Sequence, residues 1–501
     1  MSDPGTPTAP VPRSPRRRPA ARSDRAGRLP VLVALALALA ALALADAERG
    51  SGDVEALFAA ARSNPLPAAD EEGALSSTWY CAAGTAVEEG AADLTVIVAN
   101  AGDENRQGTV TWVPSAATPV ETSFEVGPRS AVSLLARDAV QAPMVSAVVE
   151  LSGGGVVVEH LVESSRGRAV AACASAPSTH WYLANGTTAR DAVESLVLFN
   201  PFPDDAIVDI RFATEQGRAE PEALQGLLVP AGTSRTAELT AVGPLRREVT
   251  ATEVVARSGR LVVDRLQAFN GSRERKGIDL TLAASAPAEV WTFPIGVQTE
   301  YLAQRWHVFN PGEREAIVSI EVLLDEGQSP EPAELSVLPH TQVVFPVDGA
   351  AFVLPVGVGH VATVRSLNGV PVVAERELDV RGTGPGAGWS SMLGAPMGAE
   401  RWVLAYGGGN VEEAVAVAIA NPGPDPLSVL VRRLDGGQAL PVDGLDTIEL
   451  PAAGHTVLDL PVTAGGALRT VLVEADGPVV VERRLTGAGT GAVSTLGIPL
   501  R

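Results

Sequence analysis

Four pairs of adjacent acidic and basic residues recur along this chain, and their side chains are of types that can do chemistry. Each pair closes an apolar run, and the four are Glu159 with His160, Asp264 with Arg265, Glu375 with Arg376, and Glu482 with Arg483. Two carboxylates in one cleft are what a hydrolase would need, and a row of carboxylates could also line a groove for sugars. Recurrence in every copy nevertheless favours a requirement of the fold, because a ligand site is usually grafted onto one domain.

The setting of these pairs at the end of apolar runs indicates β-strands. On a strand, neighbouring residues face opposite sides of the sheet. We therefore expect one member of each pair to form a cross-strand ion pair or to bond a chain end, and the other to lie in solvent. The structural interpretation of the four carboxylates is preferred, and the ligand groove stays as its alternative.

Other catalytic patterns are absent from the sequence. The six histidines never stand at ligand spacing, and there is no HExxH, no GxSxG and no phosphate-binding glycine loop. The run Gly407–Asn410 lacks a lysine and a following helix. The sequence therefore predicts no catalytic residue, no cofactor, no metal site and no enzymatic activity, although a hydrolase with an unrecognised site remains a third hypothesis.

Two cysteines, Cys81 and Cys173, stand 92 residues apart. In an exported chain such a pair predicts one disulfide, here between the opening and the closing strand of the first repeat. The second repeat has the closing phrase of Cys173 with Ala283 in its place. A redox pair or two metal ligands are the rival interpretations, but CxxC spacing and a nearby histidine cluster are both missing.

A tryptophan opens each of four copies, and an asparagine ends a strand about twenty residues later. The landmarks are Trp79, Trp181, Trp291 and Trp402, and Asn100, Asn200, Asn310 and Asn421. A proline follows the asparagine in three copies, where it ends the strand while the asparagine bonds the turn backbone. The tryptophans are expected in core or inter-domain packing, with sugar stacking as the alternative.

The asparagine landmarks lie 100, 110 and 111 residues apart, which is the length of a domain. Each copy holds seven or eight short strands with regular turns, so we expect an all-β chain of four tandem antiparallel β-sandwich, immunoglobulin-like repeats of about 105 residues. The boundaries are 75–177, 178–287, 288–397 and 398–501. A four-bladed β-propeller is the second possibility, since the joints between copies are very short.

The N-terminus has the features of an export signal. Residues 1–28 hold seven arginines and two aspartates, and the 17 residues 29–45 are uncharged and mostly apolar. They predict a disordered basic cytoplasmic tail, a single transmembrane signal-anchor and, over 46–74, a stalk, with the body outside the cytoplasm. Cleavage after Ala45, which would leave a secreted protein, is the alternative.

Several of these phrases resemble repeats of an actinobacterial family of membrane-anchored or secreted proteins of unknown function. The matching segments include Val229–Gly232, Leu450–Gly454 and Val479–Arg483, and the resemblance covers roughly residues 75–501. It implies β-sandwich-like repeats and transfers no activity. The first repeat departs most, because Asn100 has no proline after it and His160 replaces an arginine.

Charge and composition bound the partners. The chain carries a net charge of −21 even though its first segment is basic, so the acidic body argues against binding nucleic acid. The one basic cluster outside the tail is the loop Gly271–Gly277. We expect a non-catalytic extracytoplasmic scaffold or interaction protein, one form of which is an accessory to envelope assembly. Its expected partners are the membrane and an envelope protein or cell-wall glycan. A carbohydrate-binding or adhesion module is the alternative.

Overall fold

The repeats form an all-β structure. The computed structural model describes residues 65–501 except 89, 274, 348–352, 383–385, 407–412, 443–444, 446, 461–469 and 488–490. The predicted tail, the signal-anchor and most of the stalk therefore lie outside the described residues, as does the glycine run 407–410. Within the described part of the chain, no helix has both the length and the apolar character to cross a membrane.

The first repeat consists of two four-stranded antiparallel sheets, β1-β6-β3-β4 and β5-β2-β7-β8. Its elements are β1 (Ser76–Cys81), β2 (Asp93–Asn100), β3 (Arg106–Pro114), β4 (Val120–Val126), β5 (Ser130–Leu135), the 3-10 turn η1 (Ala136–Asp138), β6 (Val145–Ser152), β7 (Val156–Ser164) and β8 (Gly167–Ala172).

The second repeat has the same plan, with sheets β12-β11-β15-β9 and β14-β10-β16-β17, and β13 pairing with β11. Its elements are β9 (His180–Leu183), β10 (Ala192–Asn200), β11 (Ala206–Thr214), β12 (Gly217–Ala219), η2 (Glu222–Leu224), β13 (Leu227–Val229), β14 (Thr233–Glu238), α3 (Leu239–Val242), β15 (Thr250–Ser258), β16 (Val262–Asn270) and β17 (Lys276–Leu282).

The third repeat forms the sheets β18-β23-β20-β21 and β22-β19-β24-β25. Its strands are β18 (Val290–Val297), β19 (Leu302–Asn310), β20 (Ala316–Leu324), β21 (Ala333–Val337), β22 (Thr341–Pro346), β23 (Gly359–Ser366), β24 (Val373–Val380) and β25 (Gly388–Leu393). Trp291 of the first sheet and Trp306 of the second share one buried cluster, so the two sheets pack face to face.

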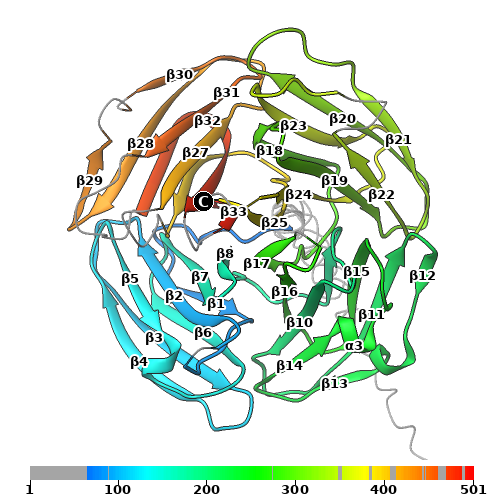
Figure 1. The fold of residues 1–501 in the computed structure, drawn as a ribbon. Coiled ribbons are helices and arrows are strands. Elements are labelled where there is room, and N and C mark those ends of the chain that lie inside the picture. The colour runs from blue at the N-terminus through cyan, green and yellow to red at the C-terminus, as the bar shows by residue number, and fades with distance from the viewer. Residues whose placement is uncertain are drawn as a thin grey trace, which may run out of the picture. The chain divides into compact units, whose positions relative to one another are not determined.

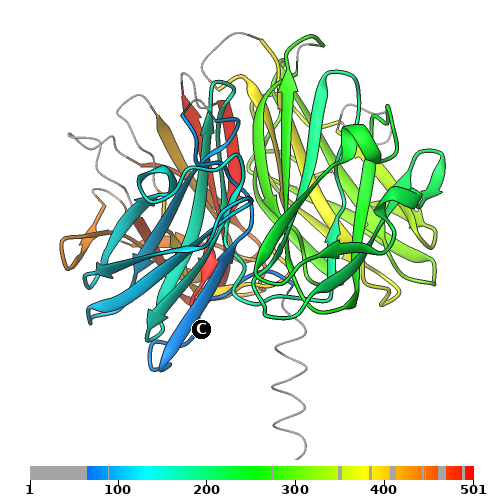
Figure 2. The same cartoon turned by 90° about the horizontal axis from the view of Figure 1, so that it is seen from below.

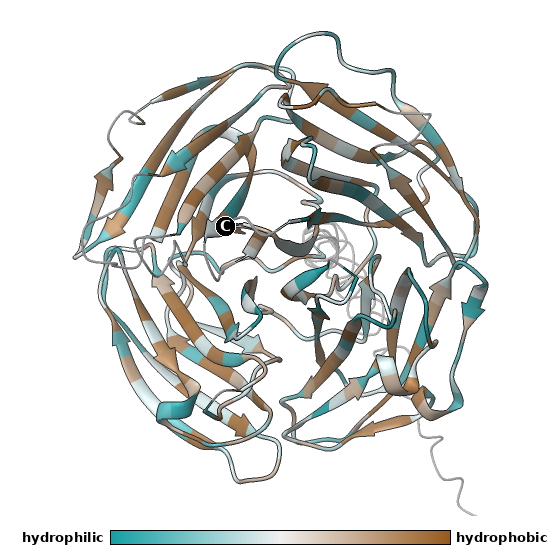
Figure 3. Ribbon diagram, viewed as in Figure 1, coloured by the Kyte–Doolittle hydropathy of each residue, from teal (hydrophilic) through white to brown (hydrophobic). Residues whose placement is uncertain are grey.

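In the fourth repeat one long strand, β32, pairs on both sheets and joins them. The strands are β26 (Ala399–Leu404), β27 (Ala414–Ala420), β28 (Leu427–Asp435), β29 (Gln438–Pro441), β30 (Ile448–Leu450), β31 (His455–Leu460), β32 (Thr470–Gly487), β33 (Gly491–Leu496) and β34 (Ile498–Pro499). Hydrophobic residues run along the strands of every repeat, while many connecting turns are hydrophilic (Figure 3).

The four repeats close into a ring rather than a linear array. One strand of each repeat lies near the centre. These axial strands are β8, β17, β25 and β33, and they contact one another in a cycle that returns from β33 to β8 (Figure 1). Seen from the side, the strands run roughly along the axis of this ring (Figure 2). Each repeat contributes two sheets, whereas a propeller blade is a single four-stranded sheet, so in this respect the ring differs from the β-propeller that was the second possibility.

The start of the described chain pairs with its end. Ala69 forms a parallel bridge with Leu500 and donates its N–H to the carbonyl of Pro499 at 2.9 Å. A backbone hydrogen bond of 3.1 Å from Gly155 to Asp70 holds the same segment against the first repeat. This short segment therefore ties the first repeat to the fourth.

Candidate functional site

The acidic and basic residues singled out in the sequence all lie at the contacts between repeats. They come from the inner strands β7, β16, β24 and β32, next to the axial strands. We call them the charged ring, and its eight members are Glu159, His160, Asp264, Arg265, Glu375, Arg376, Glu482 and Arg483, each at most 1% exposed. The expectation that one member of each pair would lie in solvent is wrong, because both faces of these inner strands are covered.

Each basic residue pairs with the carboxylate of the following repeat. Nη2 of Arg265 lies 3.0 Å from Oε2 of Glu375, and Arg376 donates to both carboxylate oxygens of Glu482. The cycle closes where Nη1 of Arg483, in the fourth repeat, lies 3.1 Å from Oε2 of Glu159 in the first. The ion pairs are therefore contacts between repeats, not cross-strand pairs within one sheet.

The junction between the first and second repeats uses a histidine in place of an arginine. Nε2 of His160 lies 3.0 Å from Oδ2 of Asp264, and both side chains are buried. Nδ1 of the same ring lies 3.3 Å from Sγ of Cys173, which is disulfide-bonded to Cys81. The predicted disulfide thus exists and touches the charged ring.

The carboxylates of the ring also accept hydrogen bonds from the backbone at or just after the end of each opening strand. Asp264 accepts the N–H groups of Ala82 and Ala83 at 3.0 and 2.9 Å. Glu375 accepts those of Ala184 and Asn185 at 2.7 and 3.2 Å. Bonds of this kind to ionised groups are stronger than neutral ones.

The other two junctions repeat this arrangement. The N–H of Ile295 bonds Glu482 at 3.2 Å, and that of Tyr406 bonds Glu159 at 2.8 Å. In the same place Arg376 donates to the carbonyl of Ile295 and Arg483 to that of Tyr406. Charge pairing and backbone bonding thus fix the same segment in every copy, which leaves these carboxylates no room to act on a ligand.

A glycine stands at the start of each axial strand, and sequence reasoning missed it; at two of the four positions it permits a close approach to the next axial strand. Each of these glycines stands six residues before Cys173 or the position that aligns with it in the other repeats. The four glycines are Gly167, Gly277, Gly388 and Gly491. A Cβ at Gly388 would lie 2.9 Å from the backbone nitrogen of Ala492, and one at Gly277 would lie 3.3 Å from that of Trp389. The fixed spacing was visible in the sequence as a repeated signal.

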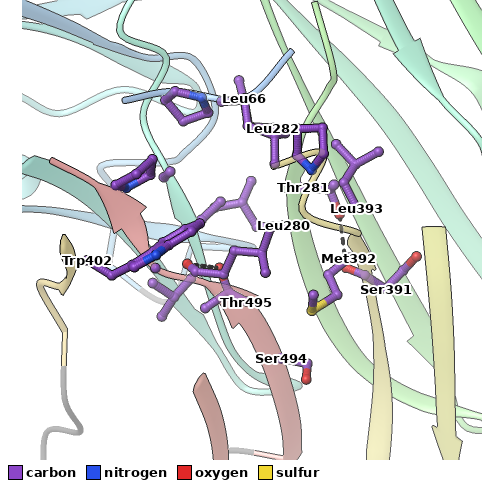
Figure 4. Close-up of a pocket in the computed structure, with 18 of the residues that line it drawn as sticks. Leu66, Leu280, Thr281, Leu282, Ser391, Met392, Leu393, Trp402, Ser494 and Thr495 are labelled. Atoms are coloured by element: carbon purple, nitrogen blue, oxygen red, sulfur yellow. Dashed lines mark hydrogen bonds between the residues drawn. The ribbon is translucent and has the colours of Figure 1, made fainter. Parts of the chain in front are cut away.

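A pocket lies between the axial strands, and we call it the axial pocket. Its free volume is about 650 Å³, which includes space open to solvent. Residues from all four repeats and from the segment before β1 line it, including Leu66, Ala172, Leu280, Met392, Met397, Trp402 and Leu496. Leu280, Leu393 and Trp402 approach this space from different strands (Figure 4). Its wall is mainly apolar, with the hydroxyl groups of a few serines and threonines, so it suits an apolar group.

Two buried carboxyl groups of the second repeat have shifted pKa values. Burial raises the pKa of Asp279 to about 6, against the opposing effect of Arg265. Burial raises the pKa of Glu194 to about 8, and the Glu194 side chain is completely enclosed. Neither group reaches the axial pocket, so neither can serve a ligand there.

The tryptophan landmarks are all buried, with at most 3% exposure. Three of the indole N–H groups donate to a backbone carbonyl of their own repeat. In each case the acceptor stands three residues before the acidic member of the charged ring. The bonds run from Trp181 to Leu261 at 2.9 Å, from Trp291 to Val372 at 2.8 Å and from Trp402 to Val479 at 2.8 Å. A tryptophan in this position packs its own repeat, and among the four Trp402 also lines the axial pocket.

The asparagine landmarks bond the turns that follow them. Nδ2 of Asn310 donates to the carbonyls of Arg314 and Val337 at 2.7 and 2.9 Å, and its Oδ1 accepts the N–H of Gly312 at 3.0 Å. In the other repeats the asparagine likewise donates to the carbonyl of the residue four positions after it; these asparagines are Asn100, Asn200 and Asn421. In repeat one the asparagine does this without a following proline.

The basic loop Gly271–Gly277 is paired within its own repeat. Arg275 binds both carboxylate oxygens of Asp191 at 2.9 and 2.7 Å, and Arg273 lies 2.6 Å from Glu248. The arginines of this basic cluster are therefore largely neutralised by nearby carboxylates.

Comparison with known proteins gives a partial family match. The sequence matches the family described as "Family of unknown function (DUF5719)" over residues 136–339, a range that begins within the first repeat and ends within the third. No curated protein matches this chain.

Three solved structures show limited similarity. Thermotoga maritima 1070 is 18% identical over 18% of this chain and 82% of its own, with a TM-score of 0.17. The Anabaena sensory rhodopsin transducer is 25% identical over 18% of this chain and 97% of its own, with a TM-score of 0.16. A tetra-tandem repeat from the extending region of a large adhesion protein is 13% identical over 85% of this chain and all of its own, with a TM-score of 0.11.

Proposed function

We propose that this chain is a non-catalytic scaffold and interaction protein of the cell envelope, whose four-repeat ring binds an envelope protein through an apolar group seated in the axial pocket. The observation that carries this proposal is that the recurrent carboxylates are all used in contacts between repeats. Every carboxylate of the charged ring is buried and bonded to a basic side chain and to backbone N–H groups, so these carboxylates stabilise the assembly of repeats.

An extracytoplasmic location is supported by two independent features. The apolar segment 29–45 with its arginine-rich flank is typical of a membrane signal, and the Cys81–Cys173 disulfide is typical of an oxidising compartment. An N-terminal anchor would hold the ring at the membrane, and cleavage after Ala45 would release it.

The chemistry of the axial pocket favours a protein partner over a glycan. Leucine, methionine, alanine and proline side chains make up most of its wall. The carbohydrate-binding alternative rested on the opening tryptophans and the recurrent carboxylates; all are buried, and only Trp402 among them lines the pocket. An apolar side chain or short apolar segment of a partner is therefore the group that fits.

Site-specific photo-crosslinking in the native membrane tests this proposal. Met397 lines the pocket and is 51% exposed, so a photoreactive residue there should give one discrete adduct with an envelope protein. Leu228, on β13 away from the pocket and 44% exposed, provides the matched control position. Equal adducts from both positions, or none from position 397, would contradict the proposal.

A variant that fills the pocket distinguishes a partner bound inside the pocket from one that only lies near position 397. Ala172→Trp places a large side chain in the pocket wall, and Ala117→Trp places the same side chain on an exposed turn of the first repeat. We expect the first to abolish the adduct from position 397 and the second to leave it unchanged. An adduct that survives Ala172→Trp in a folded protein would argue against the axial pocket as the binding site.

A further inference from the structure

One of the four junctions differs from the others in four positions that touch one another. Where the other repeats place Arg265, Arg376 or Arg483, the first has a histidine, and the carboxylate facing it is an aspartate instead of a glutamate. The two remaining differences are the cysteines. In the other repeats the position of Cys81 holds a large apolar residue and the position of Cys173 a small residue. In the third repeat these are Phe293 and Gly394, which lie in contact. A structural disulfide accounts for the cysteines but leaves the histidine and aspartate unexplained.

The aspartate determines which nitrogen of His160 carries the proton. Oδ2 of Asp264 lies 3.0 Å from Nε2 and already accepts two backbone N–H groups, so this oxygen is placed to accept a third hydrogen from Nε2. Nε2 therefore donates, and the lone pair of neutral His160 is on Nδ1. A carboxylate that orients a histidine in this way is the usual companion of a metal-bound imidazole.

The lone pair of His160 points at sulfur. Nδ1 lies 3.3 Å from Sγ of Cys173, and a disulfide sulfur has no proton to donate to it. Nδ1 and the two Sγ atoms of Cys81 and Cys173 all lie within 4.8 Å of one another, and the three residues are buried. Two sulfurs and one imidazole nitrogen form a ligand set that suits Zn²⁺.

We propose that, once the disulfide is reduced, Cys81, Cys173 and His160 bind one thiophilic divalent cation such as Zn²⁺, with Asp264 orienting the histidine. A dithiol reductant supplies two electrons and two protons, the S–S bond breaks to give two thiols, and the reductant becomes a disulfide. The cation then forms two metal–sulfur bonds as both thiols release their protons, and Nδ1 donates its lone pair. Two thiolates balance the charge of the cation, and a fourth position is left for water.

This site would hold the first repeat together under reducing conditions. Cys81 ends the opening strand β1 and Cys173 follows the axial strand β8, so a cation bridging them would make the same connection as the disulfide. The junction to the second repeat would be retained as well, since His160 keeps its bond to Asp264. Disulfide and metal would thus be alternative clamps at one place, selected by the redox conditions.

Cadmium titration of the full-length chain tests the proposal. The detergent-solubilised protein is reduced with a phosphine under native conditions and titrated with Cd²⁺, whose bonds to thiolates give a charge-transfer absorption. We expect one Cd²⁺ per chain in the reduced protein and none in the oxidised protein. Cys81→Leu with Cys173→Ala copies the apolar pair of the second repeat and should remove the absorption while the ring stays folded.

Two further variants distinguish the proposed site from unspecific thiol binding. Asp264→Asn should weaken Cd²⁺ binding about 10- to 100-fold, as expected for loss of the carboxylate that orients a metal-bound histidine. His160→Gln should weaken it further with both thiols still titratable. A folded, reduced chain that binds no Cd²⁺, binding that is unchanged in His160→Gln, a disulfide that resists the phosphine, or unfolding on reduction even with Cd²⁺ present would each overturn the proposal.

Discussion

Arg483 in the last repeat lies 3.1 Å from Glu159 in the first, so the two most distant copies of the repeat are joined by the same contact as sequence neighbours. Both side chains are buried, and both also bond the backbone at Tyr406. The chain therefore has no free end among its repeats, and the charged ring is closed. Substitutions at its recurrent positions should affect stability far more than any binding activity.

The asparagine that ends each inner strand should be a strong local determinant of stability. Asn310→Ala leaves the carbonyls of Arg314 and Val337 and the N–H of Gly312 without this partner, and we expect a loss of about 3 kcal/mol of unfolding free energy. Asn105→Ala removes only an exposed bond to Glu125 and should cost less than about 0.5 kcal/mol. Equal costs in guanidinium denaturation would contradict the role assigned to Asn310.

The axial strands should tolerate no side chain where they approach most closely. Gly388→Ala places a Cβ 2.9 Å from the backbone nitrogen of Ala492, so one strand must shift, and the expected cost is about 1–3 kcal/mol. Gly73→Ala meets nothing within 4 Å and should be nearly neutral. Thermal unfolding of the two variants compares them directly, and a neutral Gly388→Ala would show that the axis is loosely packed.

Glu194 should make the protein less stable as the pH rises. Burial raises its pKa from 4.5 to about 8, so the folded state keeps a proton that the unfolded chain has already released. The stabilisation is therefore complete below about pH 4.5 and is lost as the pH rises to about 8, by an amount on the order of 3–5 kcal/mol. Denaturation curves collected between pH 6.5 and pH 8 measure this slope, because Asp279, with a pKa of about 6, contributes little in that range.

Two amide variants provide the control for this pH dependence. Glu194→Gln should flatten the slope, because no proton is then taken up at that site. Glu238→Gln, an exposed residue on β14, should leave it unchanged. A slope that persists in Glu194→Gln would assign the pH dependence to another group.

The basic loop of the second repeat should act in stability and not in anion binding. Arg275 is held by both oxygens of Asp191, which is fully buried, and Arg275→Ala should cost about 2 kcal/mol. Arg273 and its partner Glu248 are both more than half exposed, so Arg273→Ala should cost less than about 1 kcal/mol. If the wild-type protein bound a polyanion and Arg273→Ala lost that binding, the loop would be an anion-binding site and the prediction would be wrong.

Sequence reasoning predicted the features that depend on local pattern. Alternating and continuous apolar runs indicated an all-β chain, and the two cysteines in an exported chain indicated the disulfide that joins Cys81 to Cys173. The asparagine turns follow from the same local chemistry, since Asn310 bonds residues of its own turn.

What could not be predicted are the contacts between repeats. Arg265 and Glu375 stand 110 residues apart, and no local sequence pattern indicates that the two side chains pair. Treating each repeat as a separate sandwich left one face of the inner strand exposed, which is why one member of each pair was assigned to solvent. Closure of the ring covers that face, and it also brings His160 beside Cys173, a proximity that spacing alone did not show.

A double-mutant cycle on Arg483 and Glu159 tests the closed ring most directly. Arg483→Met and Glu159→Leu each leave one buried charge without its partner, and each should cost about 3–5 kcal/mol in the unfolding free energy of the full-length chain. If the two residues pair as described, the double variant should cost clearly less than the sum of the single variants. Additive losses would mean that the first and fourth repeats are not joined at this contact, and the ring would be open.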